Sequence, residues 1–183
     1  MITVDDKKIK EVEKQLGEYK IKAPTALSRA LNRAAANAKT NAVKKVREKY
    51  SVKAADVRKT INVINANKNT LAARVKSEGT RIPLIKFNVK PSTPRTKKPP
   101  KVLKVQVKKD GLKDLVGGFV ANINGDKVFK RTSKTRLPIE QLFGPAVPQM
   151  LGTKDMREYI ESEAAKVFDQ RLEHEIHRIQ EGN

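Results

Sequence analysis

A long stretch from Pro24 to Tyr50 constrains the fold of this chain more than any other part of its sequence. Apolar residues recur there at three- and four-residue steps, the period of one face of an α-helix, at Leu27, Leu31, Ala34, Ala35, Ala38, Ala42 and Val46. Ala, Lys and Arg, which favour helix, are frequent between them. Because the stripe is narrow and rich in alanine, it lets another element approach closely while burying little area per residue. We therefore expect a long helix that docks against a partner element.

Helical patterns also occur on both sides of this stretch. A shorter amphipathic helix precedes it, with Ile9, Val12 and Leu16 on one face and Gly17 as its stop signal. From Thr153 a helical stripe continues to Gly182 through Met156, Tyr159, Ile160, Ala164, Val167, Phe168, Leu172, Ile176 and Ile179. Acidic residues gather in the first half of this C-terminal helix and complement the helix dipole in its first turn: Asp155, Glu158, Glu161 and Glu163.

Between the helices, short apolar runs separated by Asn- and Gly-containing turns predict antiparallel strands. We expect a brief helix at 54–59 and strands at 61–64, 71–76, 84–89, 102–107, 118–123 and 128–129. Asn124-Gly125, between two apolar runs, is a strong hairpin signal. The order of elements predicts an α+β fold, with long N-terminal and C-terminal helices packed on a small antiparallel β-sheet. The length of 183 residues favours a single domain, 1–183.

The segment 91–101 interrupts the predicted sheet. It contains four prolines and four cations in eleven residues, a composition that does not pack into a core. We therefore expect a flexible, projecting loop rich in Pro and Lys.

The formal net charge of +20 favours polyanionic partners, with nucleic acid, an anionic membrane and an acidic protein as the candidates. Residues 61–136 carry 19 Lys or Arg against 4 Asp or Glu, whereas residues 137–183 carry 5 against 9. Aromatic residues, which sequence-specific readers of nucleic acid use for stacking, make up only 4% of the chain. Contact with phosphates that is independent of sequence needs only well-placed cations. The residues that would serve are Lys97, Lys98, Lys101, Lys104, Lys108 and Lys109.

No motif in the sequence predicts an active site. The Gly-rich loops of nucleotide-binding proteins do not occur, and the chain has no cysteine. His174 and His177 lie one turn apart on the expected C-terminal helix, but a metal site needs further ligands, and solvated helix residues explain them better. No apolar run approaches the roughly 20 residues that cross a bilayer. We expect no enzyme activity, no cofactor, no metal and no membrane contact.

The segment 136–151 combines three prolines and one glycine with apolar side chains that need something to bury against. It contains Arg-Leu-Pro-Ile, then Gly-Pro-Ala, then Pro-Gln-Met. One interpretation is a packed connector ahead of the last helix, and the other is a surface that docks on a neighbouring molecule. The candidate packing or interface residues are Leu137, Ile139, Leu142, Phe143, Val147 and Met150.

This connector resembles the signature of the prophage minor tail protein Z family. The resemblance extends, in the same order, to Ser-Arg-Ala-Leu-Asn-Arg-Ala at 28–34, Val-Lys-Ala-Ala-Asp-Val-Arg at 52–58 and Ile-Pro-Leu-Ile-Lys-Phe at 82–87. It covers roughly residues 24–151.

The resemblance implies a structural, non-enzymatic role in the virion, at the head-proximal end of a phage tail, after assembly in the host cytoplasm. Such proteins are similar to neck and tail-completion proteins that act as ring subunits and prepare the tail to join the head. The expected partners are tail tube, terminator and connector proteins and further copies of the chain in a homo-oligomeric ring. Non-specific DNA contact in a basic lumen would then explain the cationic middle segment. The alternative is a free, non-specific nucleic-acid-binding protein that acts through the same segment.

Overall fold

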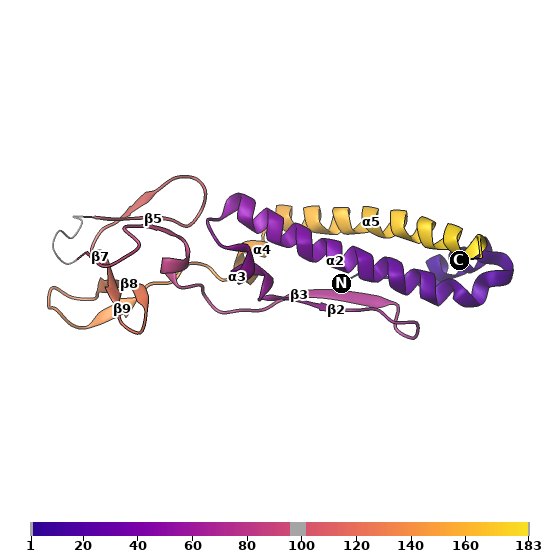
Figure 1. Cartoon of the computed structure of the whole chain (residues 1–183), viewed down its shortest axis with the longest axis horizontal. Coiled ribbons are helices and arrows are strands. Elements are labelled where there is room, and N and C mark those ends of the chain that lie inside the picture. The colour runs from indigo at the N-terminus through magenta and orange to yellow at the C-terminus, as the bar shows by residue number, and fades with distance from the viewer. Residues whose placement is uncertain (1, 96–101, 183) are drawn as a thin grey trace. The chain divides into compact units, whose positions relative to one another are not determined.

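The computed structural model describes residues 2–95 and 102–182 of the chain (Figure 1). Its helices are α1 (Asp6–Leu16), η1 (Gly17–Lys22), α2 (Ala23–Lys49), α3 (Ala54–Arg58), η2 (Leu84–Lys86), α4 (Val147–Leu151) and α5 (Lys154–Gln180), where η marks a 3-10 helix. Its strands are β1 (Ile2–Thr3), β2 (Ile61–Ile64), β3 (Ala72–Ser77), β4 (Asn88–Lys90), β5 (Leu103–Gln106), β6 (Lys113–Leu115), β7 (Gly118–Asn122), β8 (Asp126–Arg131) and β9 (Ile139–Gln141). The predicted α+β class, with long helices towards both ends of the chain, is confirmed.

The chain divides into two compact units, each of which is described by itself. The helical unit comprises residues 1–42, 61–77 and 152–183, and the sheet unit comprises residues 43–60 and 78–151. Helix α2 begins in the helical unit and ends in the sheet unit. That the chain behaves as a single domain stays a prediction.

Three helical segments form the core of the helical unit. Helix α5 runs beside α2, and α1 packs against the C-terminal part of α5 (Figure 1). The buried side chains of this core are Val12, Leu16, Ala23, Ala26, Leu27, Ala30, Leu172 and Ile179. Three alanines of α2, Ala23, Ala26 and Ala30, are buried in this core together with Leu172 and Ile179 of α5. Gly17 ends α1 with a φ of 55°, a conformation that glycine adopts without steric cost.

A small sheet covers another side of α2 in the helical unit. Its strand order is β1-β3-β2, and both pairings are antiparallel. Val63 of β2 lies opposite Val75 of β3 in the register. The sheet packs on α2 through a second buried cluster, formed by Leu31, Ala35, Ala66 and Ala73.

The sheet unit contains two further antiparallel sheets, with the strand orders β4-β5-β6 and β7-β8-β9. The predicted Asn-Gly hairpin joins β7 to β8. Asn124 and Gly125 both have positive φ, 53° and 95°, as the turn of a tight hairpin requires. Phe119 and Phe129 are register partners in this hairpin, and their ring centroids lie 6.1 Å apart.

The structure differs from the sequence-based expectation in several places, among them the strands β1 and β6, which were not expected. The strands form three sheets instead of one. The expected strand at 84–89 begins only at Asn88, because η2 occupies its first half and the Lys86 amide donates to the Pro83 carbonyl at 3.0 Å. Finally, β9 and α4 lie inside the proline-rich connector, where no regular element was expected.

Candidate polyanion-contact and assembly surfaces

Positive charge is concentrated in the sheet unit. This unit carries 23 Lys or Arg against 7 Asp or Glu, which gives +16 of the total +20. The helical unit carries 17 against 13, or +4. A polyanion is therefore attracted mainly to the sheet unit.

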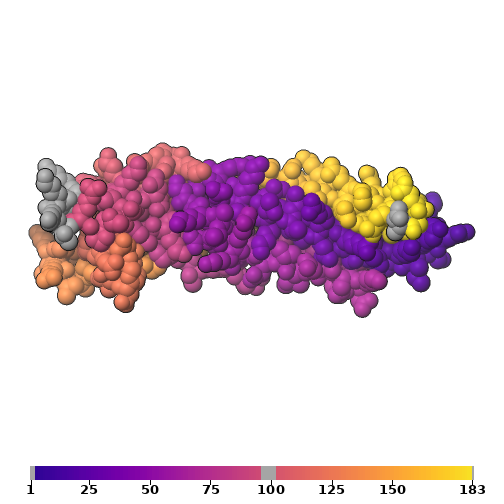
Figure 2. Space-filling model, in the orientation of Figure 1, coloured from indigo at the N-terminus to yellow at the C-terminus, as the bar shows by residue number. Residues whose placement is uncertain are grey.

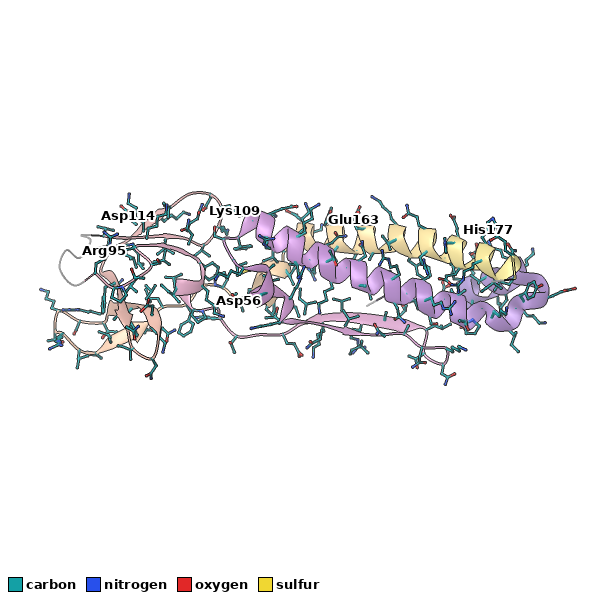
Figure 3. All side chains as sticks on the ribbon, in the orientation of Figure 1. Asp56, Arg95, Lys109, Asp114, Glu163 and His177 are labelled. Atoms are coloured by element: carbon teal, nitrogen blue, oxygen red, sulfur yellow. The ribbon has the colours of Figure 1, made fainter. Side chains whose placement is uncertain are left out.

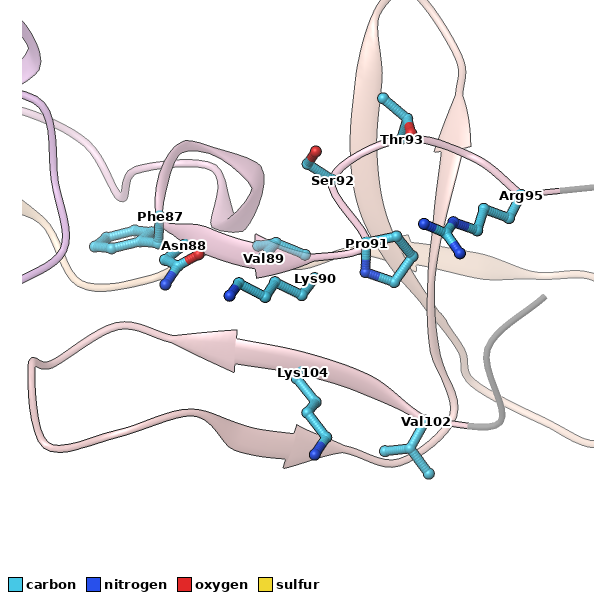
Figure 4. Close-up of a pocket in the computed structure, with 10 residues that line it drawn as sticks. All are labelled: Phe87, Asn88, Val89, Lys90, Pro91, Ser92, Thr93, Arg95, Val102 and Lys104. Atoms are coloured by element: carbon cyan, nitrogen blue, oxygen red, sulfur yellow. The ribbon is translucent and has the colours of Figure 1, made fainter. Parts of the chain in front are cut away.

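One open hollow in the sheet unit has several cations in its lining. The hollow has a volume of about 670 Å³ and is lined by β4, by the segment that follows it and by the start of β5. Its cations come from three places: Lys90 from β4, Arg95 from the loop and Lys104 from β5 (Figure 4). None of the described lining residues is Asp or Glu.

The strand register places two of these cations side by side. Lys90 is the direct cross-strand partner of Lys104. Like charges directly opposite each other in a sheet are unfavourable. Asp114 on β6 lies opposite Lys104 on its other side and balances part of this charge, so the hollow keeps a smaller excess of positive charge for a phosphate or carboxylate group.

Three of the six lysines predicted to contact a polyanion lie in the described part of the chain, and all three are exposed: Lys104, Lys108 and Lys109. The other three, Lys97, Lys98 and Lys101, lie outside the described residues. The backbone around Lys108 is held to the end of α2 and the residues after it. The Lys109 amide donates to the Lys49 carbonyl at 2.9 Å, and the Ser51 amide donates to the Val107 carbonyl at 2.9 Å.

The surface next to Lys109 is more nearly neutral. Asp110 accepts a hydrogen bond from Lys113 at 3.0 Å, and this bond lowers the pKa of the Asp110 carboxyl. A hollow of about 510 Å³ there contains Lys108 and Lys113 but also Asp110 and Asp114 (Lys109 and Asp114 are labelled in Figure 3). Because its charges balance, it attracts an anion less than the hollow beside Lys104 does.

The proline-rich connector is built into the sheet unit by backbone hydrogen bonds. The Leu142 amide donates to the Val128 carbonyl at 2.9 Å, and the Leu84 amide donates to the Leu142 carbonyl at 3.0 Å. Two residues further on, the Gly144 amide donates to the Ile82 carbonyl at 2.8 Å. These bonds hold the connector between β8 and the segment before η2.

The six candidate residues of the connector separate by exposure. Val147 and Met150 on α4 are buried, with 1% and 0% of their surface exposed. Ile139 and Leu142 are half-buried. Leu137 and Phe143, at 66% and 47%, expose large apolar side chains to solvent. The first pair therefore packs the sheet unit, and docking through the exposed last pair stays a prediction.

The two histidines lie on α5. His177 Nδ1 lies 3.1 Å from Glu181 Oε1, with both side chains largely exposed, and His174 is exposed as well (Figure 3 labels His177). Within residues 2–95 and 102–182, no group of three or more His, Asp or Glu is placed to hold a metal ion. No helix of the described residues is both long enough and apolar enough to span a bilayer.

Sequence reasoning missed two groups of charged residues. It passed over Lys90 and Arg95, because the pairing of Lys90 with Lys104 depends on a strand register that the sequence does not reveal. It also passed over Glu175, which is fully buried and forms ion pairs with arginines on α2 and α5. The spacing of Arg171, Glu175 and Arg178 on one helix was a visible signal for this second group.

Cations gathered in the sheet unit and exposed apolar side chains on the connector define the class of protein: a basic α+β protein. A family model described as prophage minor tail protein Z matches residues 7–180. Because this match spans nearly the whole chain, the protein belongs to the prophage minor tail protein Z family. No curated protein and no solved structure matched the chain.

Membership of this family confirms the resemblance drawn from residues 24–151. The protein is accordingly a structural component of a phage tail. Its place is in the virion, where it contacts other tail components.

Proposed function

We propose that the protein completes the head-proximal end of the tail, where its copies form a ring that prepares the tail to join the head. The observation that carries this proposal is the concentration of positive charge in the sheet unit, +16 of +20. A ring at that position surrounds the path of the genome. A cationic lining attracts DNA without reading its sequence, because the contacts are made to phosphates.

The hollow beside Lys104 is the proposed phosphate contact on this surface. Lys90, Arg95 and Lys104 line it, and of these Lys104 also faces Asp114 across the β5–β6 pairing. Each phosphate neutralised by such cations releases counterions, so binding weakens steeply with salt. A moving genome needs contacts of this kind, which are sequence-independent and easily exchanged.

The connector supplies the complementary assembly surface. Leu137 and Phe143 expose apolar area on a backbone that hydrogen bonds hold in place. Apolar side chains presented on a rigid segment lose little conformational entropy when a partner covers them. We propose that they dock on a neighbouring subunit or on a tail tube, terminator or connector protein. In this role the protein acts by contact and catalyses no reaction.

A free nucleic-acid-binding protein is the second candidate; the cation-lined hollow favours it, whereas membership of a tail-protein family favours the first. The two functions differ in their genetic consequence. A tail-completion protein is needed to join heads and tails, whereas a free DNA-binding protein is needed earlier, for the genome itself.

The test is electron microscopy of particles made by a phage whose gene for this chain is deleted. We expect filled heads without tails beside finished but unjoined tails, and a plasmid copy of the gene should restore joined particles. Normally joined particles in the deletion strain would contradict the proposal. A failure to replicate or package DNA, with no tail defect, would favour the second candidate.

A further inference from the structure

We propose that an arginine cluster between α2 and α5 binds the acidic first half of α5 of a second copy of the chain, and that this contact joins neighbouring subunits of the ring. The inference rests on the ring proposed above. It adds the pair of surfaces, both in the helical unit, that would hold the copies together.

The cluster surrounds one buried carboxylate. Glu175 on α5 has 0% of its side chain exposed and is contacted by three arginines. Arg29 Nη1 on α2 lies 3.2 Å from Glu175 Oε2, and Arg178 Nη2 lies 3.0 Å from the same oxygen. Arg171 pairs with Glu175 Oε1 from the preceding turn of α5. The cluster of four residues therefore has a net charge of +2.

The ion pairs with Glu175 leave hydrogen-bonding groups of the cluster without partners. Glu175 Oε1 is buried and accepts no well-aligned hydrogen bond, although Arg171 lies against it, and Arg178 Nε is buried without a hydrogen-bond partner. Each guanidinium has five N–H donors, and one carboxylate cannot use those of three arginines. The arginine side chains are 35–48% exposed. Glu175 thus fixes three guanidinium groups at the surface and leaves them with donors for another carboxylate.

The matching acidic surface lies at the other end of the same helix. Asp155, Glu158 and Glu161 recur at three-residue steps on α5 and are all exposed, and Glu158 also lies 3.7 Å from Lys154 in an exposed ion pair. Figure 3 labels Glu163 in this acidic half and His177 in the half that holds the cluster. Along the helix, Glu158 and Glu175 are about 25 Å apart at 1.5 Å per residue. In the space-filling view, α5 presents an uncovered surface along its length (Figure 2).

Charge identifies a second copy as the occupant. A chain with a net charge of +20 repels its own copies, and local patches of opposite sign reduce this repulsion where copies meet. In this sequence, residues 137–183 are the segment with an excess of acid, 9 Asp or Glu against 5 Lys or Arg. The helical unit is close to neutral overall at +4, which favours an acidic protein surface over DNA as its partner.

The two surfaces are different and lie on one chain, so each copy offers both. A contact between unlike surfaces is head-to-tail, and it closes into a ring when the rotation between copies permits. The arginine cluster of one subunit would hold the acidic stripe of the next around the whole ring.

The test is a charge exchange, read by sedimentation velocity over a range of NaCl concentrations. One variant reverses the stripe, Glu158→Lys with Glu161→Lys. The other reverses the cluster, Arg171→Glu and Arg178→Glu, together with Glu175→Gln so that no buried carboxylate faces the new acids. A control pair, Glu11→Lys with Glu18→Lys, makes the same charge change as the stripe variant on exposed positions of α1 and η1. Circular dichroism and thermal melting check that each variant folds.

We expect each reversed variant alone to associate at least tenfold more weakly than the wild type, and the control pair to associate normally. An equimolar mixture of the two reversed variants should recover the assembly, since each then meets a surface of opposite sign. If the cluster variant does not fold, the milder Arg29→Gln variant, which leaves the other two arginines in place, should still weaken association measurably.

The experiment distinguishes a failure of the proposed contact from a failure of the proposed ring. A wild-type chain that stays monomeric at low salt would overturn the ring and, with it, the contact. If the ring forms and neither charge reversal weakens its assembly, only the proposed contact would be overturned. Loss of DNA binding on cluster reversal, with assembly unchanged, would show a phosphate site and would also overturn it.

Discussion

Asn32 and Ala66 exchange two hydrogen bonds in the helical unit. The Asn32 amide nitrogen donates to the Ala66 carbonyl at 3.0 Å, and the Ala66 backbone amide donates to the Asn32 side-chain oxygen at 2.7 Å. One side chain on α2 thus satisfies both backbone groups of a buried residue in the loop between β2 and β3. This pair fixes where the β2–β3 hairpin lies along the helix.

Replacing Asn32 with Ala should lower the free energy of unfolding by about 2 kcal/mol, because it leaves a buried amide and a buried carbonyl unsatisfied. Urea unfolding followed by circular dichroism measures this change. Asn41→Ala is the matched control on the same helix, since its side chain donates a hydrogen bond to Asn37 one turn away. An equal decrease in both variants would show that the contact with Ala66 has no special role.

Gly144→Ala should destabilise the sheet unit by about 1–3 kcal/mol through overpacking. A Cβ atom at Gly144 would lie 2.5 Å from Cε2 of the buried Phe87 ring. Phe87→Leu removes the ring edge with which the new Cβ atom collides. Phe87→Leu should therefore destabilise the Gly144→Ala variant less than it destabilises the wild type. A double-mutant cycle of melting temperatures measures this coupling, and strictly additive effects would argue against the contact.

Changing Lys104, Lys108 and Lys109 together to Gln should weaken non-specific binding of duplex DNA. The plot of log K against log salt should become shallower by about 0.9 for each phosphate that is no longer neutralised, so by up to roughly 3. Fluorescence anisotropy with a labelled duplex at several salt concentrations measures this slope.

The control for that experiment is Lys7, Lys10 and Lys14 changed to Gln. These residues are exposed on α1, and their removal alters the net charge equally. We expect them to change the slope little. Equal effects of the two sets would mean that total charge, and not the surface around Lys104, determines binding.

The exposed and buried residues of the connector should respond in opposite ways. Met150→Ala should destabilise the fold by about 2–5 kcal/mol, because it leaves a cavity at a position with 0% exposure. Leu137→Ser with Phe143→Ser should change stability by about 1 kcal/mol or less but should abolish complementation of a deletion strain. Thermal melting and plaque counts measure the two effects. Full complementation by the exposed pair would refute its role in docking.

Secondary structure was predictable from the sequence where a pattern of nearby residues determines the backbone conformation. The α2 stripe follows from alanine and leucine spacing, and the β7–β8 hairpin follows from Asn124-Gly125, because each pattern fixes backbone conformation within a few residues. The first half of the expected strand at 84–89 was wrong. There Pro83 pairs with Phe143 of the connector in an isolated β-bridge, and the chain then turns into η2 before β4 begins.

The candidate surfaces were less predictable, because they depend on contacts between distant segments. The approach of Lys90 to Lys104 requires the register of two strands on either side of a proline-rich loop. The burial of Glu175 requires α2 and α5 to pack together, since Arg29 lies 146 residues away in the sequence. Composition identified the cationic surface as a region, but only the tertiary structure shows which cations share a hollow.

The most direct test of the proposed role is a cryo-electron microscopy reconstruction of the assembled particle in which this chain can be traced. We predict a ring of this chain at the head-proximal end of the tail, with Lys104 and Lys108 of the sheet unit facing the DNA path. A chain that is absent from that position, or a ring whose sheet-unit lysines face outward, would contradict the proposal.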